Sequence, residues 1–114
     1  MSNAESKFAN MLDGRLAVPE KTARAWGEIS RFVINNKQKL QNAESVEDAI
    51  SIFGAPRSQS RFAAILMMMH AHRITLGGHS VVVEGRNQDI VRVDYSTRKP
   101  LSGSETKAGG SDGE

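Results

Sequence analysis

Residues 62–69 constrain the fold of this chain more than any other segment, because they read Phe-Ala-Ala-Ile-Leu-Met-Met-Met without a polar side chain. Ser58 and Ser60 precede this segment as suitable N-caps, and Arg73 lies near its end. A helix that is apolar on every face needs cover on more than one side. The sequence therefore predicts a central helix from residue 58 to residue 73.

Three further helices are predicted before this central helix. Serines with N-cap spacing open the first and the third, and Pro19 opens the second. Gly14 and Gly54 end the first and the third. Apolar side chains recur at helical spacing in all three. The expected ranges are residues 2–13, 19–40 and 45–53.

The periodicity of the sequence changes after Gly77 and Gly78. Two runs rich in β-branched residues, 80–84 and 90–95, flank a turn-forming segment, which predicts an antiparallel β-hairpin. Residues 74–76 are a candidate for a short third strand. Because an isolated hairpin is only marginally stable in water, this one must lie on the helices, pair with a copy of itself, or both.

These elements predict a small α+β domain, with about four helices followed by a C-terminal antiparallel β-hairpin. With 114 residues the chain has room for one domain. No large apolar residue follows Leu101, so the end of the chain cannot bury enough surface to fold. We expect a compact domain over residues 1–98 and a disordered tail of glycine, serine and acidic residues over residues 99–114.

The residue types argue against an enzyme. The chain has no cysteine, which excludes disulfide bonds, thiol nucleophiles and cysteine-ligated zinc. His70, His72 and His79 lack the i, i+4 spacing of helical metal ligands, so we expect ordinary surface or helix-end histidines. Ser45, Ser58 and Ser60 are explained as caps and turn residues, and none of the three lies in a Gly-x-Ser-x-Gly motif. We therefore expect no catalytic site, no metal and no cofactor.

The sequence also lacks the patterns of membrane proteins and secreted proteins. No run approaches the ~18 consecutive apolar residues of a membrane span. The first residues do not follow the basic-then-apolar pattern of a secretory signal. We expect a cytoplasmic or intracellular protein, or a component of a virion, without a membrane partner.

Charge is unevenly distributed along the chain, although the net charge is only +2. Residues 55–98 contain six arginines and three acidic residues. Residues 55–83 contain three arginines, three histidines and no acidic residue. The second half of the domain is therefore predicted to be electropositive.

Residues 45–62 resemble a helix-turn-helix motif. A short helix is followed by a turn at Gly54 and by a second helix that opens with arginine and small polar residues. Ile50 stands where such motifs usually have alanine, and Ser60 stands where they usually have an apolar residue. With the hairpin as a wing, the resemblance implies a DNA-binding regulator. Its contacts would come from Arg57, Ser58, Gln59, Arg61, Arg73 and Arg86.

The preferred hypothesis is a non-enzymatic homodimer that acts in assembly. It depends on a small core, a central helix with excess apolar surface and a hairpin that needs a partner. Helices followed by a hairpin that pairs across a two-fold axis resemble, in architecture, several viral nucleocapsid dimerisation domains. That resemblance implies a virion component in a larger protein assembly, with DNA or RNA as a further partner. The expected dimer interface comprises Met68, Met69, Val81, Val83, Val91, Val93 and Tyr95.

Overall fold

The apolar segment lies on helix α5 (Gln59–Ala71), which contacts helix α2 and all three strands of the sheet. Its side chains from Phe62 to Leu66, and that of Met69, are buried. The prediction of a central helix covered on more than one side is therefore confirmed. The computed structural model describes residues 3–18, 25–54, 58–97 and 101.

Four shorter helices precede α5 in the described part of the chain: α1 (Asn3–Asp13), α2 (Trp26–Asn35), α3 (Lys37–Gln41) and α4 (Val46–Phe53). Side-chain caps begin α4 and α5 as the sequence predicted. The Ser45 hydroxyl accepts from the Asp48 N–H at 3.1 Å, and the Ser58 hydroxyl accepts from the Arg61 N–H at 3.1 Å. Each cap satisfies a backbone donor that has no partner inside the helix.

The helix predicted over residues 19–40 differs from the structure. Residues 19–24 lie outside the described ranges, and the remainder is divided into α2 and α3 at Asn36. At the bend the Phe32 carbonyl accepts both from the Asn36 N–H at 3.1 Å and from the Asn36 side-chain amide at 2.8 Å. The bend still places Leu40 in the core, as its position in the apolar series required.

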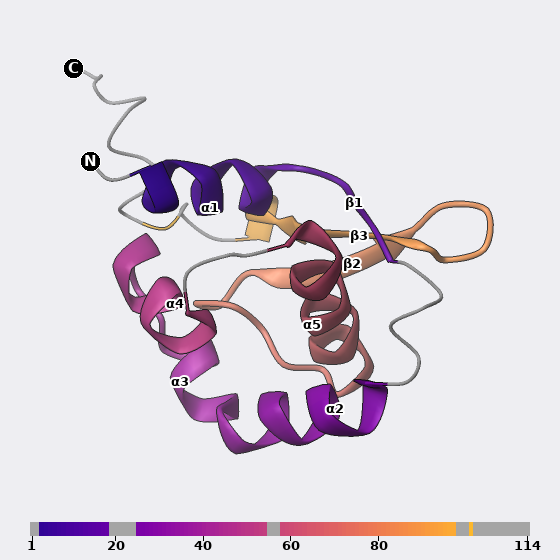
Figure 1. Cartoon of the computed structure of the whole chain (residues 1–114), viewed down its shortest axis with the longest axis horizontal. Helices are drawn as coiled ribbons and strands as arrows, with labels where there is room; N and C mark the ends of the chain where they lie inside the picture. The colour runs from indigo at the N-terminus through magenta and orange to yellow at the C-terminus, as the bar shows by residue number, and fades with distance from the viewer. Residues whose placement is uncertain (1–2, 19–24, 55–57, 98–100, 102–114) are drawn as a thin grey trace.

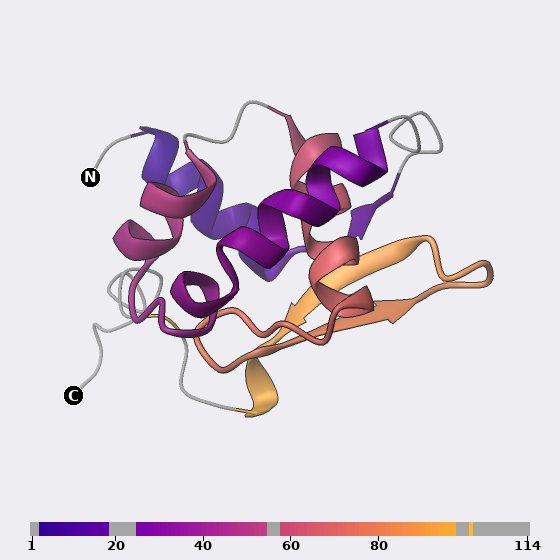
Figure 2. The same cartoon turned by 90° about the horizontal axis from the view of Figure 1, so that it is seen from below.

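The sheet has the strand order β1-β3-β2, with β1 (Leu16–Ala17), β2 (Ser80–Glu84) and β3 (Ile90–Asp94) all antiparallel to their neighbours. The predicted hairpin is confirmed. Its apolar face packs on α5, and Figures 1 and 2 show the β2–β3 turn projecting from the body. The described residues therefore form a small α+β fold.

The third strand is not where the sequence placed it. Residues 74–76 contribute only an isolated bridge between Leu76 and His79, and β1 is the strand that pairs with β3. Leu76 and His79 exchange two backbone hydrogen bonds of 2.9 Å across Gly77 and Gly78. Both glycines have positive φ, of 59° and 89°, as a two-residue hairpin loop requires. This tight loop, rather than a strand, leads the chain from α5 into β2.

Three phenylalanine rings join α1, α4 and α5 in the core. The ring of Phe8 lies 5.5 Å from that of Phe53 and 5.1 Å from that of Phe62. Leu101, which falls in the predicted tail, is 2% exposed and belongs to the same core. The rest of the predicted tail lies outside the described residues.

Candidate functional site

The described residues among those predicted to bind DNA lie at separate places on the molecule. Ser58, Gln59 and Arg61 are exposed together at the start of α5, and Arg57 lies outside the described residues. Arg73 follows the opposite end of α5, about 18 Å along the helix axis from Arg61. Arg86 lies in the projecting β2–β3 turn (Figure 2). The structure thus brings together the first turn of α5 and separates it from Arg73.

Helix α5 also differs from a typical groove-reading helix. Such a helix offers base-contacting side chains along a solvent-facing surface. In α5 every side chain from Phe62 to Leu66 is buried, so exposure begins again only with the half-buried Met67. The first turn of α5 is therefore the part that could approach a nucleic acid.

Four of the residues predicted for the dimer interface are buried within the single chain. Met69, Val81, Val91 and Val93 are 0–7% exposed within the single chain, because the apolar face of the hairpin packs on α5. Their side chains are not available to a second molecule. The other three predicted interface residues, Met68, Val83 and Tyr95, are half-buried.

The expectation of surface or helix-end histidines is wrong for His79. Its side chain is 1% exposed, and its ring centroid lies 4.6 Å from that of Tyr95. The Tyr95 hydroxyl is buried and has no hydrogen-bond partner within the described ranges of the chain. Burial raises the pKa of this phenol above its usual value, and the charge of Asp13 adds to the effect. Spacing along the sequence gave no signal for this ring pair, because sixteen positions separate its members.

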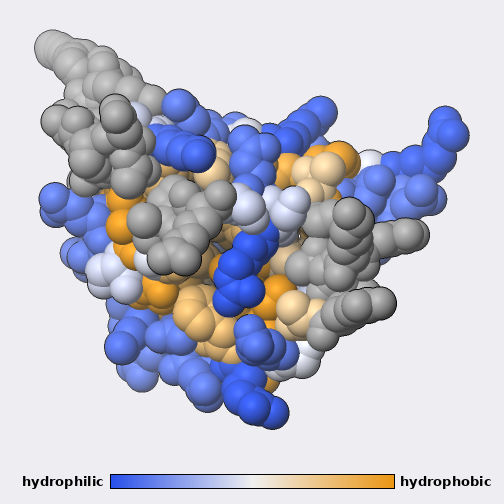
Figure 3. Space-filling model, in the orientation of Figure 1, coloured by the Kyte–Doolittle hydropathy of each residue, from blue (hydrophilic) through white to orange (hydrophobic). Residues whose placement is uncertain are grey.

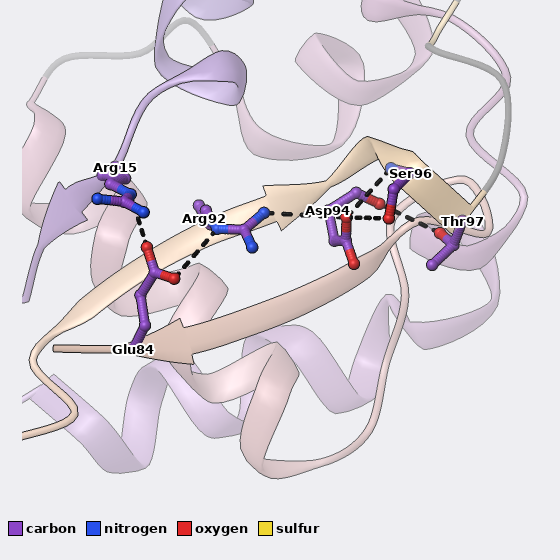
Figure 4. A network of polar contacts seen from close by, with 6 residues as sticks. All are labelled: Arg15, Glu84, Arg92, Asp94, Ser96 and Thr97. Atoms are coloured by element: carbon purple, nitrogen blue, oxygen red, sulfur yellow. Dashed lines mark hydrogen bonds and ion pairs between the residues drawn. The ribbon is translucent and has the colours of Figure 1, made fainter.

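The outer face of the sheet carries a chain of polar contacts (Figure 4). The Glu84 carboxylate pairs with Arg15 at 2.6 Å and with Arg92 at 3.4 Å. Arg92 lies 3.9 Å from Asp94, whose carboxylate accepts from the Ser96 hydroxyl at 2.6 Å and from the Ser96 N–H at 3.1 Å. These Ser96 hydrogen bonds hold the pKa of Asp94 below its usual value. The network joins β2, β3 and the residue that precedes β1, and it leaves this face with both signs of charge.

A hydrogen bond between the β1 and β3 segments shows which backbone groups of β2 point towards β3 and which point away from the sheet. The Val18 N–H donates to the Asp89 carbonyl at 2.8 Å, so the backbone groups of Asp89 point towards β1. In an antiparallel pair, successive residues point their backbone groups to opposite sides. Ile90, Arg92 and Asp94 therefore bond to β2. Their partners in β2 are Glu84, Val82 and Ser80.

The N–H and C=O groups of Val81 and Val83 consequently point away from the sheet. A ring nitrogen of His70 lies 2.9 Å from the Val81 carbonyl oxygen and covers this end of the edge. The backbone groups of Val83 have no hydrogen-bond partner among the described residues. We call the backbone of Val81 and Val83 the β2 edge; it is covered at Val81 and open at Val83.

A second surface feature is a shallow hollow of about 500 Å³ at the bend between α2 and α3. Ile34 beside it is 52% exposed and is the one large apolar side chain of the described residues that is exposed. Figure 3 shows the apolar surface of one face broken up by polar side chains. The hollow is lined by Ile34, Asn35, Lys37, Gln38, Gln41 and Asn42.

No protein-family model, curated protein or solved structure matches this chain. Within the described ranges, no group of three or more histidine or acidic side chains is placed to hold a metal ion. None of the helices in this part of the chain combines the length and the apolar character needed to cross a membrane. The open β2 edge is therefore the feature from which a function is best argued.

Proposed function

We propose that this protein is a non-enzymatic assembly protein that works as a homodimer and takes part in a larger protein assembly. The observation that carries the proposal is the open backbone of Val83 on an edge strand. Unpaired N–H and C=O groups on such a strand are a template for pairing with another chain.

The composition of β2 supports this proposal. The strand reads Ser-Val-Val-Val-Glu, and Val82 and Val83 are half-buried. β-Branched residues favour strand pairing, and the usual edge protections, lysine and proline, are absent from β2. Glu84 is the one charge in the strand, and its carboxylate is already paired with Arg15 and Arg92.

The proposal is tested by the molecular mass in solution of wild type, Val83→Pro and Val83→Thr. Proline removes the outward N–H of residue 83 and leaves the bonds of Ser80, Val82 and Glu84 to β3 in place. We expect wild type and Val83→Thr to sediment as dimers at micromolar concentration and Val83→Pro to sediment as a monomer. Circular dichroism establishes that each variant is folded. A wild-type protein that stays monomeric at high concentration contradicts the proposal.

DNA or RNA binding is the second candidate function, because the first turn of α5 is exposed and has no acidic residue. Negative charge near a helix N-terminus is favoured by the helix dipole, so a phosphate would be stabilised there. Binding to labelled duplex and single-stranded oligonucleotides is measured over a salt series. If this function holds, Arg61→Glu weakens binding and reduces the salt slope by about 0.9. The matched control is Arg31→Glu, an exposed position on α2.

A further inference from the structure

We infer that two copies of β2 pair antiparallel about a two-fold axis that passes through Val83. This inference rests on the proposed homodimer and adds the register of its interface. Two sheets of three strands would then form one continuous sheet of six. The partner is a second copy of this chain because the open donor and acceptor belong to the same residue. A symmetric antiparallel pair satisfies both at once.

The hydrogen bonds of this pairing are specific. The Val83 N–H donates to the carbonyl of the partner's Val83, and the reverse bond forms by symmetry. Towards the start of the strand, Val81 is 7% exposed and its carbonyl lies 2.9 Å from the His70 ring nitrogen. Val83 is therefore the position in β2 where both outward groups are open.

The two neighbouring registers are less favourable. An axis through Val82 would pair Val83 with the partner's Val81, whose carbonyl His70 already contacts. An axis through Glu84 would need the Gly85 carbonyl, which accepts from the Gln88 N–H at 3.2 Å. It would also place two Glu84 side chains directly opposite each other, and like charges at such positions are destabilising. The central pair of the register centred on Val83 needs neither the Val81 nor the Gly85 carbonyl, and this register keeps the two Glu84 side chains from lying opposite each other.

The inferred register sets which side chains meet across the interface. On the outer face of the joined sheet, Val82 lies opposite the partner's Glu84, and the contact occurs twice. Residues opposite each other in a non-hydrogen-bonded antiparallel pair have Cβ atoms about 4.5–5.5 Å apart. Disulfide bonds need Cβ atoms at about 3.5–4.5 Å, which a small shift of the strands provides.

Cysteine cross-linking tests the register, because the chain contains no cysteine of its own. Val82→Cys and Glu84→Cys are made as separate proteins, one with a size tag, and are oxidised alone and as a mixture. We expect a covalent dimer of one tagged and one untagged chain in the mixture, at least about tenfold above either protein alone. Ser96→Cys mixed with Val82→Cys is the matched control, because Ser96 is exposed but lies outside the strands. The amount of covalent dimer in this control mixture measures cross-linking by random collision.

The other possible results of cross-linking and sedimentation overturn the inferred register, and each of them indicates a different arrangement. Cross-linking of Val82→Cys alone indicates an axis through Val82, and cross-linking of Glu84→Cys alone indicates an axis through Glu84. A dimer by sedimentation without any specific cross-link places the interface elsewhere and leaves the proposed homodimer standing. A monomer by sedimentation overturns the register and the proposed function together.

Hydrogen exchange provides a second test that needs no substitution. In the inferred dimer the Val83 amide gains a hydrogen-bond acceptor, so its exchange slows at least about tenfold as the wild-type concentration rises through the dissociation constant. The Asn87 amide in the projecting turn is the internal control and should not change. A Val83 amide whose exchange is independent of concentration in a protein that sediments as a dimer contradicts the register.

Discussion

Gly77 is the residue where the backbone is most tightly constrained. Its φ is +59°, its N–H donates to the Leu40 carbonyl at 2.8 Å, and a Cβ there would lie 2.2 Å from the Ala43 carbonyl oxygen. We expect Gly77→Ala to lower the free energy of unfolding by about 2–4 kcal/mol, from backbone strain and displacement of the loop before α4. Urea denaturation followed by circular dichroism measures the change.

The control for Gly77 is Gly27, a helical glycine in α2 where an added Cβ would meet no atom within 4 Å. Gly27→Ala should raise the free energy of unfolding by about 0.5–1 kcal/mol, because alanine favours the helix. A Gly77→Ala variant as stable as Gly27→Ala would show that the loop between α5 and β2 does not pack against α3 and α4 as described.

Tyr95 gives the protein an alkaline dependence of stability. Burial raises the pKa of the folded phenol above the value of about 10 that it has in an unfolded chain. Stability from this residue is complete below pH ~10 and falls as pH rises further, because the unfolded chain then loses the proton first. Unfolding free energies measured across this range should decrease in wild type and decrease less in Tyr95→Phe.

Tyr95→Phe should also be neutral or stabilising by up to about 1 kcal/mol at neutral pH, because the buried hydroxyl has no hydrogen-bond partner to lose among the described residues. The chain has a single tyrosine, so phenolate absorbance reports this residue alone. A titration of the folded protein that matches the titration in urea would contradict the described burial.

At the scale of elements, the end of α5 is the least expected feature. The Ile74 N–H donates to the Met69 carbonyl at 2.8 Å and the Arg73 N–H donates to the His70 carbonyl at 3.0 Å. These bonds define a Schellman motif, in which the residue with positive φ is usually glycine. Here it is Arg73, with φ of 58°. The buried pair Ile74 and Met69 provides the apolar contact that accompanies the motif.

Because Arg73 holds a left-handed conformation, we expect Arg73→Gly to raise the free energy of unfolding by about 0.5–1 kcal/mol. Arg73→Ala is the control, since alanine keeps the Cβ atom and should bring no such gain. Thermal denaturation of the three proteins measures the difference. Equal stability of Arg73→Gly and Arg73→Ala would mean that the side chain of Arg73 matters more than its backbone.

The elements that the sequence predicted correctly carry a local signal. α5 has an unbroken apolar run, α4 and α5 have serine caps, and the hairpin has alternating residues around a turn. β1 was missed because two residues are too few to show alternation. The division at Asn36 was missed because the apolar pattern of the sequence continues through it as far as Leu40.

The candidate site was less predictable, because it depends on contacts between distant segments. Valine alternation predicted which face of the hairpin is apolar, but α5, rather than a second molecule, covers it. The open edge at Val83 depends on strand order, and strand order depends on β1.

At the scale of the whole molecule, dimerisation should make thermal stability depend on protein concentration. A partner that binds only the folded chain stabilises it by mass action. A tenfold increase in wild-type concentration should therefore raise the apparent Tm, while Val83→Pro should melt at one temperature at all concentrations. Differential scanning calorimetry over a dilution series distinguishes the two. A wild-type Tm that is independent of concentration would contradict dimerisation in this range.

The pairing of β1 with β3 also governs the order in which the chain can fold. Leu16 and its partner Val91 are 75 positions apart, so closing the sheet joins segments made early and late in translation. At about 5–20 residues per second, the ribosome takes roughly 4–15 seconds to make the intervening segment. Leu16 must wait through this interval without the strand that it pairs with. Such contacts of high sequence separation slow folding, and the apolar side chain of Leu16 stays without its sheet until β3 has been made.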